Sequence, residues 1–373
     1  ERLLLNMDKK KALISTLLSL LLLEVVSCGY YRKAVPKDQR VAVELMLGLT
    51  GSDSHTVSRY QAHPYFNYVG ASDYQFKNGQ KAHDSLGFRA QTALPAEPVE
   101  GRLRLVALGA STTYGMYFGK AASVWPEQLE GLLASKDQPA DAVSLALPAY
   151  SSFELLGVTA MLVPELRPDW VLIHSGMNDA FAVGFKDEGG PDNRNFRHAW
   201  SFSPPGVLTL AAMRWSKTAR LLVMRSLPNL GDMITAMQFA APTGEALAAH
   251  IKAADGRYYK RNLKSMLALI RSFGAKPMLI NMSLNPNFEQ RRDPYQAAVA
   301  AAVSRNNRLM AELAAETGTA YVDLYSELRS AELFLDAVHV NQVGMALKSK
   351  LISEALLQAI AAEEGPPSVV TEP

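Results

Sequence analysis

Residues 103–115 read LRLVALGASTTYG, and the architecture of the chain can be worked out from them. Residues 103–108 form a short apolar run whose only polar side chain is Arg104, a pattern typical of a strand buried on both faces. The run stops at small residues that begin with Gly109. In open α/β folds the end of such a strand lies at the carboxyl edge of the sheet, where ligands bind. Ser111 is therefore a candidate nucleophile, although Ser111 and Thr112 would also serve simply to cap the next helix.

Strand-like and helix-like patterns alternate along the chain after this stretch. Alternation of this kind predicts a parallel sheet with helices on both of its faces. We therefore expect an α/β fold with three layers. The predicted strands are 103–108, 142–147, 169–174, 277–281 and 320–323, and the predicted helices lie near 123–135, 151–163, 256–273, 293–317 and 341–362.

Composition narrows the class of protein. The chain has 373 residues, 48% of them hydrophobic, and a formal net charge of +2, which suits a globular core. No basic cluster or zinc-finger spacing is present, so nucleic acid is not an expected partner. Cys28 is the only cysteine. An intrachain disulfide and a catalytic thiol in the globular part are thereby excluded.

The amino-terminal region resembles an export segment. Lys9, Lys10 and Lys11 precede an apolar run at 12–23, the layout of a signal peptide and a short length for a membrane span. The sequence Val25-Val26-Ser27-Cys28 resembles a bacterial lipoprotein box, and Glu24 separates this box from the apolar run. We expect residues 1–28 to be an export signal or a membrane or lipoprotein anchor. Lipidation of Cys28, cleavage elsewhere and retention of the helix all remain open.

The rest of the chain divides into four predicted parts. Residues 29–95 have mixed polarity and are expected to wrap the main domain, with HPYFNY at 63–68 and HDSLGFRA at 83–90 as ordered contacts. The main domain is expected over 96–363. A long insertion at 180–245 interrupts the alternation of strands and helices, as lids and pocket-shaping segments do. The tail at 364–373 is expected to be disordered.

Two further segments carry residues suited to acyl transfer chemistry. In LDAVHVNQVG, residues 335–344, Asp336 stands three positions before His339, between the last strand and the last helix. This spacing lets a carboxylate orient an imidazole that serves as base for a serine. In HSGMNDA, residues 174–180, Asn178 follows a buried strand, where its amide is a candidate oxyanion donor or a helix cap. Backbone N–H groups in LALPAYSSFE at 145–154 are further candidates.

These segments, in this order and each after a strand, resemble the blocks of the SGNH (GDSL-type) hydrolase family. GASTTYG resembles the first block, GMND the third and DAVH the last. HDSLGFRA and YYKRNLKSML at 258–267 also resemble a bacterial envelope branch with an N-terminal signal or anchor. The resemblance covers roughly residues 60–360. It implies a flavodoxin-like α/β/α sandwich with a five-stranded parallel sheet.

The resemblance also implies the roles of individual residues. Ser111 would be the nucleophile, His339 the base and acid, and Asp336 its orienting partner. The oxyanion donors would be the Ser111 N–H, the Asn178 amide and a second-block N–H. That block departs from the family pattern, because Ser144 replaces its asparagine and Ala149 its glycine. Ala149 keeps an N–H, which is useful only if the turn tolerates a Cβ.

The function expected from these residues is a serine esterase that forms an acyl-serine intermediate and needs neither metal nor cofactor. Its substrate would be a small-molecule or glycan ester, and its location the bacterial envelope after export, periplasmic or attached to the membrane. Two alternatives remain: an acyltransferase that modifies cell-surface polysaccharide, and a non-catalytic envelope binding protein.

Three other polar residues near these segments are interpreted structurally. His174 is expected to be a hydrogen-bonded core histidine rather than a substrate contact. Arg89 is expected to be an ion-pair partner rather than a substrate clamp. Asp179 is expected to hold the loop that carries Asn178.

Overall fold

The computed structural model describes residues 2–35, 40, 60–63, 65–76, 79–90, 93–119, 123–193, 196, 207–226, 244–290 and 293–364. The chain packs as two units, one formed by 1–62 with 197–240 and the other by 63–196 with 241–373. The boundaries predicted at 29–95, 96–363 and 180–245 remain predictions. The tail expected at 364–373 lies outside the described residues from position 365 onward.

A five-stranded parallel sheet forms the centre of the larger unit. Its strand order is β4-β3-β5-β6-β7. The first strand of this sheet along the chain is β3, with the sequence LRLVALG, and it lies between β4 and β5. This is the flavodoxin-like order, with the chain reversing direction of travel across the sheet at β3. The strands are β3 (Leu103–Gly109), β4 (Ala140–Ser144), β5 (Trp170–His174), β6 (Lys276–Ile280) and β7 (Ala320–Val322).

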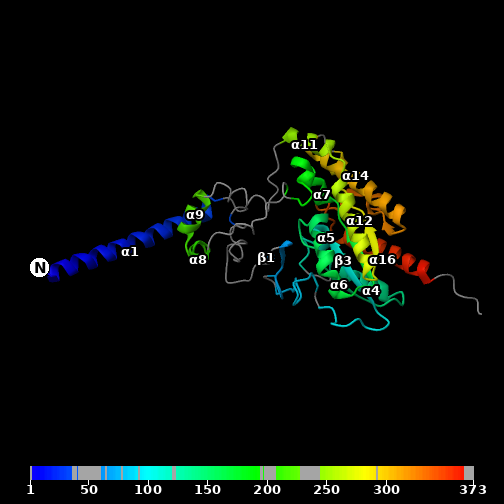
Figure 1. Cartoon of the computed structure of the whole chain (residues 1–373), viewed down its shortest axis with the longest axis horizontal. Coiled ribbons are helices and arrows are strands. Elements are labelled where there is room, and N and C mark those ends of the chain that lie inside the picture. Colours follow the sequence, from blue (N-terminus) through cyan, green and yellow to red (C-terminus); the bar gives the residue numbers. More distant parts are fainter. Residues whose placement is uncertain are drawn as a thin grey trace, which may run out of the picture. The chain divides into compact units, whose positions relative to one another are not determined.

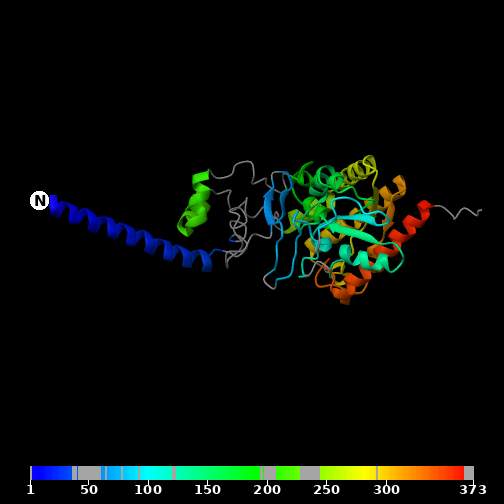
Figure 2. The same ribbon diagram turned by 90° about the horizontal axis from the view of Figure 1, so that it is seen from below.

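Helices cover both faces of the sheet, as Figure 2 shows. One face packs against α4 and α16 through a continuous apolar cluster that includes Trp125, Leu129 and Ile352. On the other side α5, α12 and α14 pack against one another, and α12 contacts β6. The three-layer α/β/α fold expected from the sequence is therefore confirmed (Figure 1).

The helices of this unit are α3 (Ser111–Tyr114), α4 (Trp125–Ala134), α5 (Ser152–Met161), α6 (Val163–Leu166), α7 (Met177–Ala182), η2 (Lys186–Gly189), α11 (Gly244–Ala253), α12 (Arg257–Ser272), α13 (Pro286–Glu289), α14 (Pro294–Thr317), α15 (Leu324–Glu327), η3 (Ala331–Leu333) and α16 (Gln342–Glu364). Among them α4, α5, α12, α14 and α16 lie close to the predicted ranges, whereas the others were not predicted. A short two-stranded sheet pairs β1 (Tyr60–His63) with β2 (Asn67–Gly70).

The second strand is the one whose position differs from the prediction. It was expected at 142–147 but pairs with β3 from Ala140, opposite Leu103, to Ser144, opposite Ala107. Residues 145–147 are buried, but the paired register ends at Ser144, after which the Leu145 N–H still donates to the Ala107 carbonyl at 3.0 Å. The polar residue Asp141 lies inside the strand because Arg102 reaches it with a hydrogen bond of 2.6 Å.

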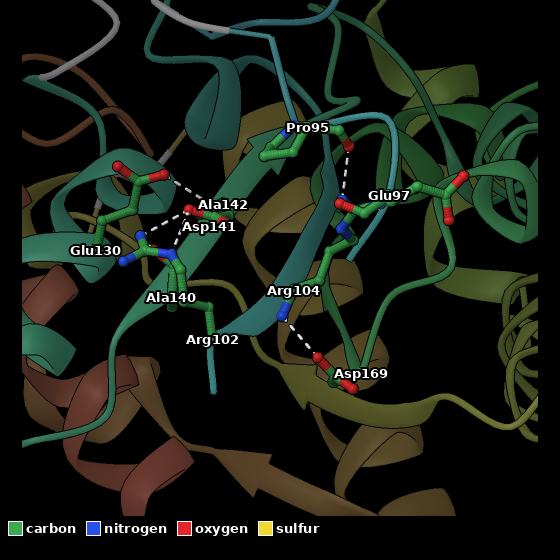
Figure 3. Close-up of polar contacts among 9 residues, drawn as sticks. All are labelled: Pro95, Glu97, Arg102, Arg104, Glu130, Ala140, Asp141, Ala142 and Asp169. Atoms are coloured by element: carbon green, nitrogen blue, oxygen red, sulfur yellow. Dashed lines mark hydrogen bonds and ion pairs between the residues drawn. The ribbon is translucent and has the colours of Figure 1, made fainter. Parts of the chain in front are cut away.

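The amino-terminal edge of the sheet is fixed by polar contacts, which Figure 3 shows. Arg104 is 2% exposed, and its guanidinium donates to the carbonyl groups of Pro95 (2.6 Å), Glu97 (2.7 Å) and Leu166 (2.9 Å). Its backbone N–H donates to Asp169 at 2.7 Å. Both terminal nitrogens of this buried guanidinium thus have acceptors, which offsets part of the cost of burying a charge. These contacts anchor β3 at the end of the sheet opposite Ser111.

The smaller unit contains α1 (Arg2–Lys33), α8 (Val207–Trp215) and α9 (Lys217–Ser226). α1 is one continuous helix (Figure 1) that runs well beyond the apolar run at 12–23. Residues 11–33 are long and apolar enough to cross a membrane by length and composition. α9 packs against α1 and against α8.

Candidate active site

Ser111 lies directly after the central strand, at the carboxyl edge of the sheet. It is the first residue of α3, whose N-cap position is held by Ala110 with no side-chain hydrogen bond. Ser111 is thus not used as a helix cap. Gly109 makes this turn possible, because a Cβ there would lie 2.2 Å from Thr113 Oγ1 and 2.8 Å from the His174 carbonyl oxygen.

His339 and Asp336 lie beside Ser111, although 228 residues separate the serine from the histidine in sequence. His339 Nε2 is 2.8 Å from Ser111 Oγ, and His339 Nδ1 is 2.8 Å from Asp336 Oδ2. The carboxylate, the imidazole and the hydroxyl therefore form one hydrogen-bonded chain. The imidazole is 13% exposed and the carboxylate 37%, so the chain is accessible from solvent.

The loop that carries Asp336 also orients it. Asp336 Oδ1 accepts hydrogen bonds from the backbone N–H groups of Val338 (2.9 Å) and His339 (2.8 Å). Partial burial raises the pKa of Asp336, but the hydrogen bonds from the His339 ring and from these N–H groups outweigh it. They hold the pKa of this carboxyl well below its ordinary value. Asp336 is therefore ionised at neutral pH, so its Oδ2 can only accept, and the Nδ1–H of His339 donates the hydrogen bond between them.

Tyr117 is a member of this site that sequence reasoning missed. Its hydroxyl donates to Asp336 Oδ2 at 3.0 Å, and its ring lies edge-on to the His339 ring with centroids 5.1 Å apart. Burial and the hydrogen bond to Asp336 raise the pKa of Tyr117, so it stays a neutral donor. Its position six residues after Ser111 carries no family pattern in the sequence that would have indicated this contact.

The candidate oxyanion donors lie at the ends of neighbouring strands. Asn178 is in the first turn of α7, just after β5, and its Nδ2 donates one hydrogen bond to the Tyr150 carbonyl at 2.7 Å. An amide has two N–H bonds, so one remains for a ligand. Neither the Ser111 nor the Ala149 backbone N–H donates a hydrogen bond to another described residue. Ala149 has φ of +67°, the left-handed conformation that glycine adopts without strain.

A buried polar cluster supports the loop that carries Asn178. Asp179 accepts from the backbone N–H of Ser152 at 3.1 Å and from its hydroxyl, and Asn262 Nδ2 donates to the same hydroxyl at 2.9 Å. Burial raises the pKa of Asp179 to about 6, although the Ser152 hydrogen bonds oppose this shift. Asn262 belongs to the YYKRNLKSML segment of α12. The expectation that Asp179 holds this loop agrees with these contacts.

A lysine and a histidine are buried together behind the turn that carries Ser111. Lys348, 2% exposed, lies with Nζ 2.8 Å from His174 Nε2 and 3.3 Å from the Thr112 carbonyl oxygen. His174 Nδ1 lies 3.3 Å from the Ile280 carbonyl oxygen. Burial lowers the pKa of Lys348 to about 7, and burial and the nearby lysine hold the pKa of His174 well below its ordinary value. His174 is thus a core residue, as expected, but its lysine partner was not foreseen.

The segment before the sheet contacts α3, the helix that begins at Ser111. His83 Nε2 is 2.9 Å from the Tyr114 hydroxyl, and the Arg89 guanidinium donates to the Tyr114 carbonyl at 3.1 Å. Arg89 was expected to be an ion-pair partner, whereas its guanidinium contacts backbone carbonyl groups, including that of Phe118 at 2.8 Å. Within the described part of the chain, no three His, Cys, Asp or Glu side chains converge as metal ligands do.

Comparison with known families gives the class of this protein. The model of the GDSL-like lipase/acylhydrolase family matches residues 107–347, which include β3 and the last active-site loop. The chain therefore belongs to the GDSL-like lipase/acylhydrolase family. It is a hydrolytic enzyme that acts on esters.

Solved structures with a similar fold come from several bacteria. A GDSL-like lipase from Bacteroides thetaiotaomicron has 16% identity and a TM-score of 0.41, with 71% of this chain and 93% of that chain covered. The lipase/acylhydrolase from Enterococcus faecalis has 17% identity and a TM-score of 0.41, covering 69% and 96%. An acetylxylan esterase from Geobacillus stearothermophilus has 15% identity and a TM-score of 0.40, covering 69% and 94%. No curated protein matches the sequence.

Proposed function

We propose that this enzyme hydrolyses carboxylic esters through an acyl-serine intermediate formed on Ser111. The observation that carries the proposal is the hydrogen-bonded chain Asp336–His339–Ser111, with 2.8 Å at each of its two links. A serine hydroxyl is a weak nucleophile until a base takes its proton, and the base needs a third group to hold its tautomer.

In the first half of the cycle, Ser111 Oγ attacks the ester carbonyl carbon while its proton passes to His339 Nε2. The imidazolium is stabilised by Asp336, whose ionised state follows from its lowered pKa. His339 then gives the proton to the leaving alkoxide, and the alcohol departs. In the second half, a water oxygen attacks the acyl carbon while His339 takes a proton from the water. The bond between the acyl carbon and Ser111 Oγ then breaks, His339 returns the proton to Oγ, and the carboxylic acid departs.

The developing oxyanion would be stabilised by three donors from three strand ends. They are the N–H of Ser111, the N–H of Ala149 and the second Nδ2–H of Asn178. Support comes from the two backbone N–H groups, which donate to no other described residue, and from the Tyr150 hydrogen bond that orients the Asn178 amide. Donors fixed before the reaction stabilise a transition-state charge at no cost of reorganisation.

We further propose that the substrate is an acyl group on an envelope glycan or on a small ester, met after export. The support for export is the apolar segment within residues 11–33, whose apolar run at 12–23 is preceded by three consecutive lysines. An acyltransferase would use the same residues and differ only in the acceptor that attacks the acyl-serine.

The test measures turnover of nitrophenyl acetate, butyrate and octanoate by the full chain, beside Ser111→Ala. Ser135→Ala serves as a matched control because this exposed serine caps the far end of α4. We expect Ser111→Ala to lose all enzymatic turnover and Ser135→Ala to keep it, with the order of the three esters giving the size of the acyl pocket.

Each assay is repeated with a soluble oligosaccharide as a second acceptor. Turnover in water alone that the sugar leaves unchanged supports the hydrolase. Release of nitrophenol that requires the sugar, with the acyl group recovered on it, would replace the hydrolase proposal by the acyltransferase. Equal turnover in Ser111→Ala and the wild type would contradict both.

A further inference from the structure

The helix α1 contains a single charged residue between Ala12 and Tyr31, and that residue has partners. Glu24 accepts a hydrogen bond from Ser216 Oγ at 2.7 Å and others from the backbone N–H groups of Lys217 and Thr218, the latter at 3.2 Å. Because Lys217 begins α9, the carboxylate lies at the amino-terminal end of that helix, where anions are stabilised. An acidic side chain within an apolar helix is costly unless it is paired in this way.

The same side of α1 continues into an apolar and aromatic contact with α9. Tyr31 is 1% exposed, and Lys217 Nζ and Arg220 Cζ lie 5.0 Å and 5.6 Å from the centre of its ring. Ser27 is also buried. Residues 24, 27 and 31 share one helix face, since they are three and four positions apart. This face of α1 is therefore a specific docking surface for α9.

The remaining faces of these helices are apolar and uncovered. Leu208 is 86% exposed, Trp215 85% and Leu222 60%, although the buried face of the same pair of helices holds Met213 and Arg220. On α1 the exposed apolar side chains are Leu13, Ile14, Leu17, Leu18, Leu20, Leu21, Leu22, Leu23, Val25 and Val26. Apolar surface of this extent marks an interaction site.

The dimensions and charges of the unit fit a lipid bilayer. Ala12 to Tyr31 is a helical length of about 30 Å, the thickness of the hydrocarbon core. Three lysines precede this length, and Arg32 and Lys33 follow it. Glu24 lies about 10 Å along the helix from Tyr31, close to the depth at which interfacial helices bury their apolar faces. Tryptophan, as at position 215, is favoured at the membrane–water interface.

We propose that α1 is retained as a membrane anchor, and that α8 and α9 lie in the surface of the same bilayer, docked on the anchor through Glu24 and Tyr31. Cleavage before Cys28 would remove Glu24 and Ser27 and leave the amino-terminal end of α9 without its carboxylate. The pair of helices thus provides a second membrane contact beside the spanning helix. This inference concerns attachment and is independent of the chemistry at Ser111.

The first test measures the mass of the wild-type chain recovered from bacterial membranes. The expected mass is that of a chain that includes residues 11–33 and carries no lipid on Cys28. A chain that begins at a lipid-modified Cys28 would overturn the proposal.

The second test locates α8 and α9 with a fluorescent probe. The full chain carrying Cys28→Ser is reconstituted in vesicles of phosphatidylethanolamine and phosphatidylglycerol, with the probe attached at Leu208→Cys, at Leu222→Cys or, as an exposed control on the larger unit, at Lys136→Cys. We expect nitroxide-labelled lipid to quench the probes at 208 and 222, and aqueous iodide to quench the probe at 136. Iodide quenching at 208 and 222 equal to that at 136 would overturn the proposal. Protection of these two probes from iodide in protein oligomers that contain neither lipid nor detergent would also overturn it.

A matched pair of substitutions tests the docking contact. Glu24→Gln keeps an acceptor for the α9 N–H groups, whereas Glu24→Leu removes it and leaves the anchor apolar. We expect lipid quenching at position 222 to be kept in Glu24→Gln and to fall in Glu24→Leu, with both chains still in the membrane fraction. Equal quenching in the two variants would contradict the role of Glu24. Hydrolysis of a soluble nitrophenyl ester, measured on the same vesicles, reports separately on the proposed esterase.

Discussion

Two histidines near the carboxyl edge of the sheet have opposite surroundings. His339 is partly exposed and lies between a carboxylate and a serine hydroxyl, each 2.8 Å away. His174 is 1% exposed and lies between the Lys348 ammonium, 2.8 Å away, and a carbonyl group. A carboxylate stabilises the imidazolium that a general base must form, whereas a buried lysine opposes it.

The difference indicates that the partners of each ring, rather than residue type or proximity to Ser111, distinguish the proposed base His339 from the packing residue His174. His174 belongs to the strand adjacent to β3, and its carbonyl faces the turn at Gly109. It is nevertheless held neutral, and with Lys348 it supports the backbone at Thr112.

The largest expected effect separates the two histidines directly. His339→Ala should lower kcat by about 10⁴-fold, because the serine loses its base. His174→Ala should retain most of the activity of the molecules that stay folded but lower the free energy of unfolding by about 3 kcal/mol, because it leaves a cavity and an unpaired buried lysine. Ester turnover and urea unfolding of both variants check this. A loss of kcat in His174→Ala as large as in His339→Ala would remove the distinction.

The second effect concerns the oxyanion donors. Asn178→Ala should lower kcat by about 10²-fold with little change in KM, because the amide acts on the transition state rather than on the bound ester. Steady-state kinetics on nitrophenyl acetate measure it. Circular dichroism and urea unfolding serve as controls, since Asn178 also donates to Tyr150. A change confined to KM would assign Asn178 to substrate binding instead.

The third effect is a pH dependence that originates at Lys348. Its pKa is about 7 in the folded protein and near the ordinary lysine value when unfolded, so between pH 7 and about 10 the unfolded chain binds more protons. Stability should therefore rise with pH in this window, by about 1 kcal/mol for each pH unit at this site. Lys348→Met should remove this contribution. Urea unfolding of both proteins at pH 7, 8 and 9 gives the slopes, and parallel slopes would contradict the buried position of the amine.

The smallest effect tests the turn at Ala149. Ala149→Gly should raise the free energy of unfolding by about 0.5 kcal/mol, because glycine adopts φ of +67° without strain and this gain exceeds its greater entropy when unfolded. The N–H is unchanged, so kcat should remain within about twofold. Thermal or urea unfolding detects the change. A destabilised variant would show that the alanine methyl group packs in a way that offsets the strain.

Much of the fold could be predicted because the sheet is buried on both faces. Strands such as β3 and β5 are continuous apolar runs that end in polar or small residues, and their helices have clear apolar spacing. β4 was misplaced because Leu145 to Leu147 are apolar and buried like a strand, although the paired register ends at Ser144. Contacts between distant segments, such as the Arg104 guanidinium with the Pro95 and Glu97 carbonyl groups, leave no local pattern.

In the candidate site too, residues in local sequence patterns could be predicted, whereas residues defined by distant contacts could not. Ser111, Asn178, Asp336 and His339 each follow a strand within a family block, so their order along the chain is the basis on which they are predicted. Tyr117 and Lys348 were missed, because each lies within a helix or turn whose local pattern is ordinary and whose partners are hundreds of residues away. Glu24 was noticed only as an interruption of the apolar run, since its partners belong to the segment after 207.

The serine that a fluorophosphonate modifies covalently shows whether Ser111 is the nucleophile. The full chain, Ser111→Ala and His339→Ala are treated in parallel, and the modified peptide is identified by tandem mass spectrometry. We expect a phosphonyl group on Ser111 of the wild type, none in Ser111→Ala, and much slower labelling in His339→Ala. Labelling of a different serine, or no labelling of folded wild-type protein, would contradict the assignment of Ser111 as the nucleophile.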